Sequence, residues 1–237
     1  MKGTGRLDRR LVEAGYGSRK EVGRLIKQER VVVDGVVAIS PEMKVPPEAT
    51  LVVDGQRVVP TPVAIVYHKP VGVLVTMDDP WGRATVATLL GDALAGALHP
   101  VGRLDQDSSG VLLFSSDGQL TQRLLHPKRA VEKEYIATVE GVIPPTLGAL
   151  LAAGVGTEEG IHSARLVSAE GSEVRLVVTE GKHRMVRRML ANLGLPVSAL
   201  VRVRFGPVSL GGLAEGEIRE LDDAELSWFD GLMGRAK

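Results

Sequence analysis

The sequence predicts an α+β protein with a small N-terminal domain, residues 1–60, and a larger domain, residues 63–237. Helical and strand patterns follow one another without a regular strand–helix–strand repeat, which favours a mainly antiparallel mixed sheet with flanking helices. Pro60 and Pro62 interrupt the apolar pattern and are typical of a linker. With 237 residues, 44% of them hydrophobic, the chain can form one large core and one small one.

Two short helices and two β-hairpins are expected in the N-terminal domain. The apolar residues of 7–14 have helical spacing, and Ser18 with Glu21 forms a capping box that predicts the start of a second helix. The tetrapeptide Val-Val-Asp-Gly occurs twice, ending at Gly35 and at Gly55. Asp-Gly between apolar runs indicates a tight hairpin turn, so the two copies predict a small β unit.

The larger domain mixes strands with helices. Its strands are predicted from short runs rich in β-branched and aromatic residues, and its helices from longer segments that are amphipathic or rich in Ala and Leu. Strands are expected at 65–67, 71–75, 111–114, 135–139 and 174–179, and helices at 85–98, 145–153 and 182–193.

Charge is distributed unevenly, although the formal net charge is zero. Residues 1–30 contain nine Lys or Arg against four acidic residues, and residues 182–204 contain six against none. Residues 205–237 reverse the sign, with seven acidic residues. Clusters of this kind can bind a polyanion, although solvated helix faces have the same composition. The candidate contacts are Arg9, Arg10, Arg19, Lys20, Arg24 and Lys27 in the first cluster and Lys182, Arg184 and Arg188 in the second.

Composition excludes several classes of protein. The chain has no cysteine, which excludes disulfides, thiolate catalysis and cysteine-based zinc sites. No apolar run approaches the roughly 18 residues of a membrane span. The N-terminus has no apolar signal region, so export is not expected, and a cytoplasmic location is.

The turn at 102–110 contains the most informative carboxylate, Asp105, two residues after Arg103. The spacing of a calcium loop matches in part, but its twelfth position is Ser116 instead of a bidentate Glu, so calcium is rejected. A glycosidase pair with Asp107 fits the separation of the two backbone positions. With aromatic residues at only 3% of the chain, a sugar-binding platform is not supported.

A third interpretation is that Asp105 is a nucleophile kept ionised by nearby cations. The segment 182–193 supplies candidates, since its apolar residues form one face of a helix and Arg187 lies beside that face. Arg187 can therefore reach inward while the other cations of the segment face solvent or a polyanion. An amphipathic helix with ordinary exposed arginines has the same spacing, so the residues alone leave both alternatives open.

Residues 6–59 resemble the S-four (αL) RNA-binding module first known from a small-subunit ribosomal protein. Leu7, the Gly15–Gly17 turn, the capping box at Ser18 and the strand before Gly35 occur in the expected order. The resemblance implies that the Lys and Arg side chains of the first basic cluster bind backbone phosphates of RNA, with little base selectivity.

Four further motifs occur in order after this module. They are His68-Lys69-Pro70-x-Gly72, Gly102-Arg103-Leu104-Asp105 with Gly110 and Asp117-Gly118, Glu132-Lys133-x-Tyr135, and Glu180-Gly181-Lys182-x-x-x-Val186-Arg187-Arg188-Met189. Together they resemble the RsuA/RluB-type family of bacterial ribosomal-RNA pseudouridine synthases over essentially the whole chain. Two departures from the usual family pattern lie close to Asp105 and concern its local turn: Ser115-Ser116 and Asp107-Ser108-Ser109.

The resemblance implies a role for each matching residue. Asp105 corresponds to the catalytic aspartate, which attacks the target nucleotide at the anomeric carbon or after glycal formation while uracil detaches, rotates and rejoins through carbon five. Tyr135 corresponds to the tyrosine that packs against the base and takes a proton, Arg187 to the basic residue paired with the aspartate, and Arg103 to the arginine that contacts the target's backbone. The uridine must leave its helix to be reached. Because the reaction is an isomerisation, no cofactor and no metal are expected.

The expected function is conversion of a uridine in ribosomal RNA to pseudouridine. The segments 187–189 and 201–208 resemble the large-subunit branch more than the small-subunit branch, which is the alternative target. A non-catalytic RNA-binding factor in ribosome assembly is the other alternative, since it would use the same basic surfaces. The expected partner is ribosomal RNA in an assembly intermediate, with no membrane and no small-molecule cofactor, and the chain is expected to act as a monomer.

Overall fold

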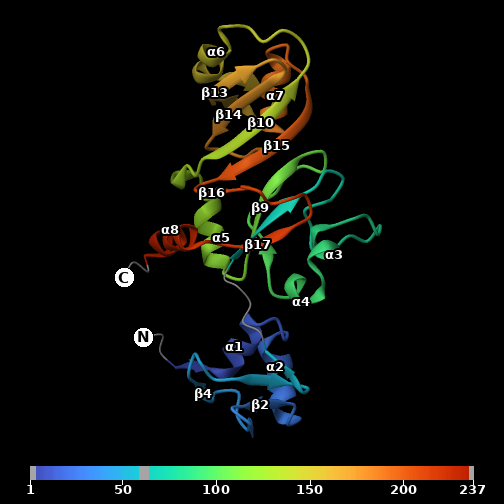
Figure 1. The fold of residues 1–237 in the computed structure, drawn as a ribbon, viewed down its shortest axis with the longest axis vertical. Helices are drawn as coiled ribbons and strands as arrows, with labels where there is room; N and C mark the ends of the chain where they lie inside the picture. Colours follow the sequence, from blue (N-terminus) through green and yellow to red (C-terminus); the bar gives the residue numbers. More distant parts are fainter. Residues whose placement is uncertain (1–3, 59–63, 235–237) are drawn as a thin grey trace. The chain divides into compact units, whose positions relative to one another are not determined.

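The computed structural model describes residues 4–58 and 64–234 (Figure 1). Contacts between Cα atoms divide the chain into two compact units, one of Met1–Val63 with Leu90–His99 and the other of Ala64–Leu89 with Pro100–Lys237. The expected linker at Pro60–Pro62 lies outside the described residues. Within the described parts of the chain, no helix is both long and apolar enough to cross a membrane.

Residues 4–58 of the first unit contain two short helices, a two-stranded sheet β1-β4 and a four-stranded sheet in the order β3-β2-β5-β6. Both helices turn apolar side chains into one core, which Leu7 enters from α1 and Ile26 from α2. The bounds of the elements are β1 Gly5–Arg6, α1 Leu7–Glu13, α2 Arg19–Lys27, β2 Val31–Val33, β3 Val36–Val37, β4 Lys44–Val45, β5 Leu51–Val53 and β6 Gln56–Arg57.

The local chemistry predicted for this unit is confirmed. Ser18 Oγ accepts a hydrogen bond from the backbone N–H of Glu21, and the Glu21 carboxylate accepts one from the backbone N–H of Ser18, so the capping box is complete. The Asp-Gly pairs have φ values of 50° and 85° at 34–35, and of 53° and 78° at 54–55. Two successive positive φ values are those of a type I′ turn, which explains why both hairpins contain Asp-Gly.

A nine-stranded sheet runs through the second unit in the order β13-β14-β10-β15-β9-β7-β17, with β16 and β8 off this path. Along the path the β9–β15 pair is parallel and the other pairs are antiparallel, which confirms the mainly antiparallel mixed sheet. The bounds are β7 Ala64–Lys69, β8 His99–Pro100, β9 Ser109–Ser115, β10 Lys133–Val139, β13 Arg165–Glu170, β14 Glu173–Val178, β15 Val197–Phe205, β16 Val208–Ser209 and β17 Ile218–Glu220.

The parallel pair joins two antiparallel halves of this sheet through two residue pairs, Val201 opposite Ser109 and Arg202 opposite Gly110. We refer to these four residues as the strand junction. Gly110 has a φ of 114°, and a Cβ atom at this position would lie 2.2 Å from the carbonyl oxygen of Arg202. Because no side chain fits at that distance, glycine allows the two strands to approach each other here.

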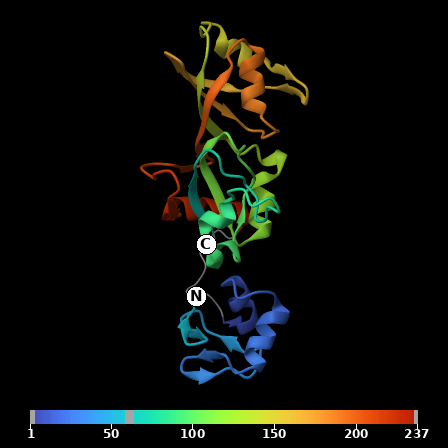
Figure 2. The same cartoon turned by 90° about the vertical axis from the view of Figure 1, so that its right-hand side faces the viewer.

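Helices pack on both halves of the sheet. Figures 1 and 2 show α6 and α7 beside the β13-β14-β10-β15 half, and α5 and α8 beside the β9-β7-β17 half. Leu120 and Leu124 of α5 and Phe229 of α8 are buried in one core with Val111 and Leu113 of β9. The remaining bounds are α3 Val86–Leu90, α4 Asp92–Ala95, α5 Gly118–Leu125, the 3-10 helix Pro127–Arg129, α6 Leu147–Ala153, β11 Val155–Thr157, β12 Gly160–His162, α7 Met185–Asn192 and α8 Asp223–Met233.

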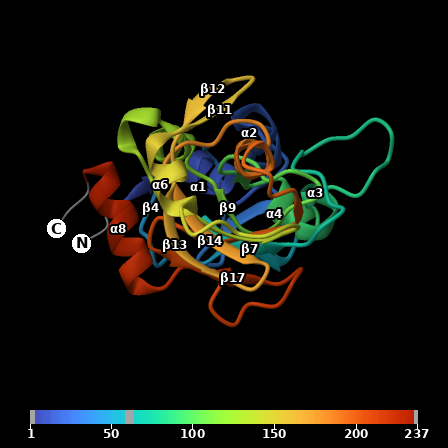
Figure 3. The ribbon, with the colours of Figure 1, turned by 90° about the horizontal axis from the view of Figure 1, so that it is seen from above.

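The strand expected at 71–75 is wrong. Gly72 has a φ of 89° and turns the chain away from β7, and this segment then makes a single bridge between Leu74 and Thr85. The following residues, 76–84, extend away from the sheet as a loop before α3 (Figure 3).

Two predicted helices have different limits because single residues adopt the left-handed conformation. The helix expected at 85–98 is divided into α3 and α4 at Gly91, which has a φ of 74°. The helix expected to begin at Lys182 begins at Met185, because Arg184 has a φ of 53° and cannot continue a right-handed helix.

Candidate active site

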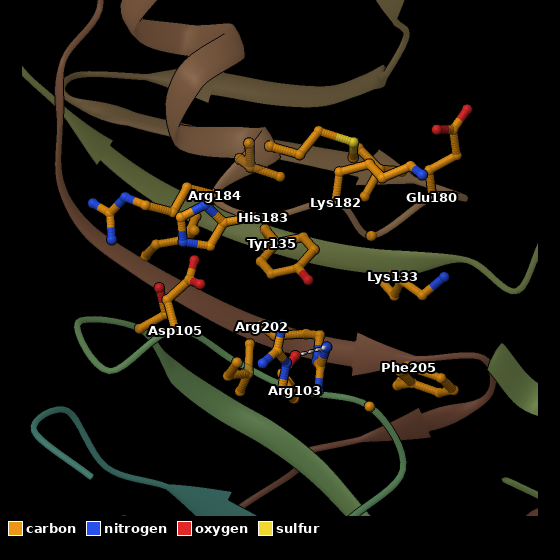
Figure 4. Close-up of a pocket in the computed structure, with 18 of the residues that line it drawn as sticks. Arg103, Asp105, Lys133, Tyr135, Glu180, Lys182, His183, Arg184, Arg202 and Phe205 are labelled. Carbon is orange, nitrogen blue, oxygen red and sulfur yellow. Dashed lines mark hydrogen bonds between the residues drawn. The ribbon is translucent and has the colours of Figure 1, made fainter. Parts of the chain in front are cut away.

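A pocket of about 330 Å³ opens beside the strand junction (Figure 4). Most of its lining comes from the turn 101–108 that leads into β9, the neighbouring strands β10 and β15, and the segment 180–186 at the start of α7. Asp105 enters the pocket from the turn and Tyr135 from β10. The fold therefore brings these two predicted residues to one site from distant parts of the sequence.

Lys69, at the end of β7, holds the turn that carries Asp105. Its side chain is 0% exposed, and Nζ donates hydrogen bonds to the carbonyl oxygens of Pro70, Asp105 and Ser108 at 2.9, 3.2 and 2.8 Å. Burial lowers the pKa of Lys69 to about 8, while the charges of Asp105 and Asp107 act to raise it. The sequence placed Lys69 in a motif without a role, and the structure shows that it positions the turn.

Arg187 is buried and is bonded to the same turn. Nη2 donates to the carbonyl oxygen of Asp107 at 2.7 Å, Nη1 donates to that of Val197 at 2.9 Å, and Nε lies 3.4 Å from the Asp107 carboxylate. The direct ion pair of Arg187 is therefore with Asp107, whereas the resemblance implied Asp105. Asp105 points into the pocket, and its charge acts on Arg187 only through space.

Asp107 also holds Arg184, which has an unfavourable left-handed backbone at the N-cap of α7. Nη2 of Arg184 donates to Oδ2 of Asp107 at 2.8 Å. Burial alone would raise the pKa of Asp107, but the hydrogen bond from Arg184 and the charge of Arg187 outweigh burial and hold this pKa below its ordinary value. Asp107 is thus an ionised carboxylate that positions two arginines beside the pocket.

Two cations that the sequence did not identify as site residues, Lys133 and Arg202, line the deeper part of the pocket. Arg202 lies opposite Tyr135 in the register of β10 and β15, and Lys133 lies opposite Phe205. Arg202 is 3% exposed and Lys133 is 9% exposed. The sequence could have identified Lys133, because it is two residues before Tyr135 and residues two apart on a strand point to the same face. Arg202 had been counted in the basic cluster, but it is buried and not part of the surface.

The remaining candidates of the second unit differ in their surroundings. Arg103 and Lys182 are exposed at the pocket. Arg188 faces the β11–β12 hairpin instead, where Nη1 lies 3.3 Å from Glu158 and 3.5 Å from Glu159.

The basic residues of the first unit also divide into two groups. The exposed cations lie on α2, away from its buried Val22 and Ile26: Arg19, Lys20, Arg24 and Lys27. Arg9 is exposed and pairs with Glu13 at 2.7 Å. Arg10 is bonded within the protein, since Nη1 donates to the carbonyl oxygen of Pro46 at 2.6 Å and Nη2 to that of Pro47 at 3.2 Å.

The pocket combines one half-buried carboxylate, an aromatic side chain and several cations. Such a site can enclose a nucleotide whose flat base packs against Tyr135 while Asp105 faces the sugar. The cations offset the negative charge of the phosphates around it.

Comparisons with known proteins identify the family of the chain. The RNA pseudouridylate synthase family model matches residues 63–192, and the S4 domain model matches residues 5–51. An uncharacterized RNA pseudouridine synthase of Mycobacterium tuberculosis is 40% identical over 231 residues, which cover 93% of this chain and 91% of that protein. The ribosomal large subunit pseudouridine synthase B of Salmonella typhi is 36% identical over 241 residues, covering 96% and 83% of the two chains.

A solved structure of a pseudouridylate synthase is also similar in fold. It superposes with a TM-score of 0.66 at 29% sequence identity, and the match covers 94% of this chain and 99% of that one. These matches confirm the two resemblances found in the sequence, one to the S-four module and one to the pseudouridine synthases. The chain therefore belongs to the RNA pseudouridylate synthase family of isomerases and carries an S4 domain before its pseudouridine synthase region.

Proposed function

We propose that this chain converts a uridine of large-subunit ribosomal RNA to pseudouridine, with Asp105 as the nucleophile. The observation that carries the proposal is the position of Asp105: its carboxylate enters the pocket from a turn fixed by Lys69 and Arg187, facing Tyr135. Relatives named as ribosomal large subunit pseudouridine synthase B support the choice of RNA.

In the proposed reaction the target uridine leaves its helix and enters the pocket, since attack inside a stacked helix is sterically blocked. A carboxylate oxygen of Asp105 bonds to C1′ of the ribose as the N1–C1′ bond breaks, and the electron pair of that bond leaves with the uracil ring. The ring then rotates so that C5 faces C1′. The C5–C1′ bond forms as the Asp105 ester bond breaks and returns its electron pair to the carboxylate. Loss of the C5 proton and protonation of N1 complete the isomerisation.

Side chains around the pocket support parts of this reaction. Arg187 and Arg184 keep the loop into α7 attached to the turn through Asp107, which fixes where Asp105 stands. Tyr135 offers a face for the base, and its hydroxyl can relay a proton, accepting one from C5 as it gives its own up toward N1. Arg103, exposed at the mouth of the pocket, is suited to contact the phosphate backbone beside the flipped nucleotide.

The substrate in this proposal is an assembly intermediate in the cytoplasm, because the pocket requires a uridine that can still leave its helix. The exposed cations of α2 would bind phosphates in another part of the RNA. They would hold the RNA without selecting its sequence. The chain acts as a monomer in this proposal, and sedimentation of the protein with and without RNA tests that part.

The function is tested with ribosomal RNA and pre-ribosomal particles tritiated at C5 of uracil. The wild-type chain should release tritium, and Asp105→Asn should abolish release while RNA affinity changes little. Asp78→Asn, which removes an exposed carboxylate from the 76–84 loop, is the matched control and should release tritium at the wild-type rate. Absence of release from every RNA would identify the chain as a non-catalytic RNA-binding factor, and release from small-subunit RNA alone would correct the target.

A further inference from the structure

Lys133 and Arg202 form a pair of buried cations that the reaction described above does not use. Nζ of Lys133 donates to the carbonyl oxygen of Thr179 at 2.9 Å, and Nε of Arg202 donates to that of Val111 at 2.8 Å. Within the described residues neither cation forms an ion pair. Glu180, whose charge acts on Lys133, is half exposed and is hydrogen-bonded to His162.

Arg202 has an unused donor in this position. Its Nη1 reaches the carbonyl oxygen of Arg103 at 3.5 Å, but its Nη2 is buried and has no hydrogen-bond partner among the described residues. Buried polar groups are nearly always hydrogen-bonded, and a buried charge without a partner is costly. Arg202 lines the pocket, so its guanidinium is placed to turn Nη2 toward a ligand that supplies oxygen atoms.

The two cations are less exposed than Asp105, and each lies near the Phe205 ring. The Lys133 Nζ is 5.6 Å and the Arg202 Cζ is 5.3 Å from the centroid of the Phe205 ring. Figure 4 shows Asp105 on one side of Tyr135 and Lys133 with Phe205 on the other. The half-buried Asp105 therefore lies on one side of the pocket and the buried Lys133 on the other, with Arg202 opposite Tyr135 in the register of β10 and β15. We call the part of the pocket that Lys133 and Arg202 line its cationic end.

The shape of the RNA chain decides which of its groups can reach this end. A phosphodiester continues into backbone on both sides, so it can line the mouth of a pocket but does not extend inward to buried residues. A base is attached at one point only, its C1′, and can extend inward from a ribose held at Asp105. Uracil also carries two carbonyl oxygens on its edge, which accept hydrogen bonds from ammonium and guanidinium groups.

We propose that Lys133 and Arg202 bind the carbonyl oxygens of the flipped uracil and stabilise the negative charge that the ring acquires when its bond to the ribose breaks. This inference rests on the proposed isomerisation. When the N1–C1′ bond breaks, its electron pair spreads from N1 over the ring and its carbonyl oxygens. Preorganised donors aimed at developing charge in a site that excludes water stabilise a transition state more than a ground state.

The buried position of Lys133 supports this assignment. Burial lowers the pKa of Lys133 to about 8, and the charge of Arg202 lowers it further in the same direction. An anion bound in the pocket beside both cations would offset their repulsion. A uracil anion held there would also stay in the pocket while it rotates, before C5 faces C1′.

The first test is single-turnover isomerisation by Arg202→Gln and Lys133→Met, followed by chromatography of the nucleosides after digestion of the RNA. Arg202→Gln should slow the reaction roughly 100-fold, the effect of removing one such donor, and Lys133→Met should slow it by a similar factor. The RNA dissociation constant should change by less than about threefold, since the stabilisation is realised in the transition state. Arg204→Gln removes a neighbouring cation of β15 that pairs with Glu132 and Glu134, and is the matched control.

The second test replaces the target uridine with 5-fluorouridine. Fluorine withdraws electrons, so the departing anion is more stable by itself and depends less on the protein. The defect of both variants should therefore shrink to roughly tenfold or less when loss of 5-fluorouridine is followed. An equal defect with both substrates, or a defect only in RNA affinity, would overturn the inference while leaving the isomerase function intact.

The two proposals fail in distinguishable ways. If the wild-type chain isomerises no RNA, the proposed function is lost. If the wild type isomerises uridine and both variants do so at its rate, only the cationic end is wrongly assigned. Arg202→Lys and Lys133→Gln serve where a variant does not fold, judged by thermal denaturation, and the same dependence on 5-fluorouridine is expected of them.

Discussion

Replacing Lys133 by Met should make the protein more stable at neutral pH while making it a slower enzyme. Met has a side chain of similar length, so it fills the space of the lysine stem without its charge. What the variant loses is the hydrogen bond from Nζ to the carbonyl oxygen of Thr179. What it gains is relief from burying an ammonium group beside Arg202.

The magnitude follows from the pKa of Lys133. This pKa falls from 10.5 to about 8 in the folded protein, and one pKa unit corresponds to about 1.4 kcal/mol, so the charged side chain opposes folding by about 3 kcal/mol. Loss of the hydrogen bond to Thr179 costs about 1 kcal/mol. The free energy of unfolding of Lys133→Met should therefore exceed that of the wild type by about 2 kcal/mol at neutral pH.

The sign of the pH dependence follows from the lowered pKa. Below pH 8 Lys133 is protonated in both the folded and the unfolded protein, and the destabilisation is complete. Between about 8 and 10.5 the unfolded chain binds more protons, so wild-type stability rises with pH and the advantage of the variant disappears.

Urea denaturation at about pH 7 and about pH 10 measures this difference. Both tryptophans, Trp81 and Trp228, belong to the second unit, so their fluorescence follows that unit alone. A variant less stable than the wild type at neutral pH, or a difference that does not change with pH, would refute the reasoning. Lys182→Met, at an exposed lysine of the same pocket, should show neither the gain nor its pH dependence.

Two further substitutions test structural roles. Gly110→Ala should destabilise the second unit by about 4 kcal/mol or more, because the new Cβ meets the backbone of Arg202. Gly118→Ala is the control, since it has open space around its Cβ and should change stability little. Equal effects of the two substitutions in urea denaturation would contradict the close approach of the strands at Gly110. Arg10→Ala should weaken the first unit by about 1–3 kcal/mol through loss of two bonds to loop carbonyls, measured by hydrogen exchange. Lys20→Ala should leave hydrogen exchange unchanged and reduce the salt dependence of RNA binding. If Arg10→Ala instead leaves hydrogen exchange unchanged and reduces the salt dependence, Arg10 is an RNA contact.

The parts of the fold that local chemistry determines could be predicted from the sequence. The capping box of Ser18 and Glu21 acts between residues three apart, and the two Asp-Gly turns need only their own φ values. The ordered motifs placed Asp105 and Tyr135 in one pocket for the same reason that they identified the family: their spacing reflects a fixed arrangement of elements.

What the sequence could not give depends on contacts between distant residues. The late start of α7 follows from Arg184, whose left-handed backbone accompanies an ion pair with Asp107. The burial of Arg202 follows from its place opposite Tyr135 and Gly110, which no local pattern contains. The sequence of an arginine-rich segment is the same whether its side chains are exposed to solvent or line a pocket.

The strand junction also affects the order in which the protein becomes functional during synthesis. It joins residues far apart in the chain: the hydrogen bond from Arg202 to Val111 spans 91 positions. Contacts of such separation form late in folding, after local elements have formed, and the N-terminal part of a chain is made first. A nascent chain therefore has the exposed cations of α2 before β15 has emerged to complete the pocket. Each molecule therefore forms the basic surface of α2 first, and the pocket is completed only when β15 has folded into the sheet.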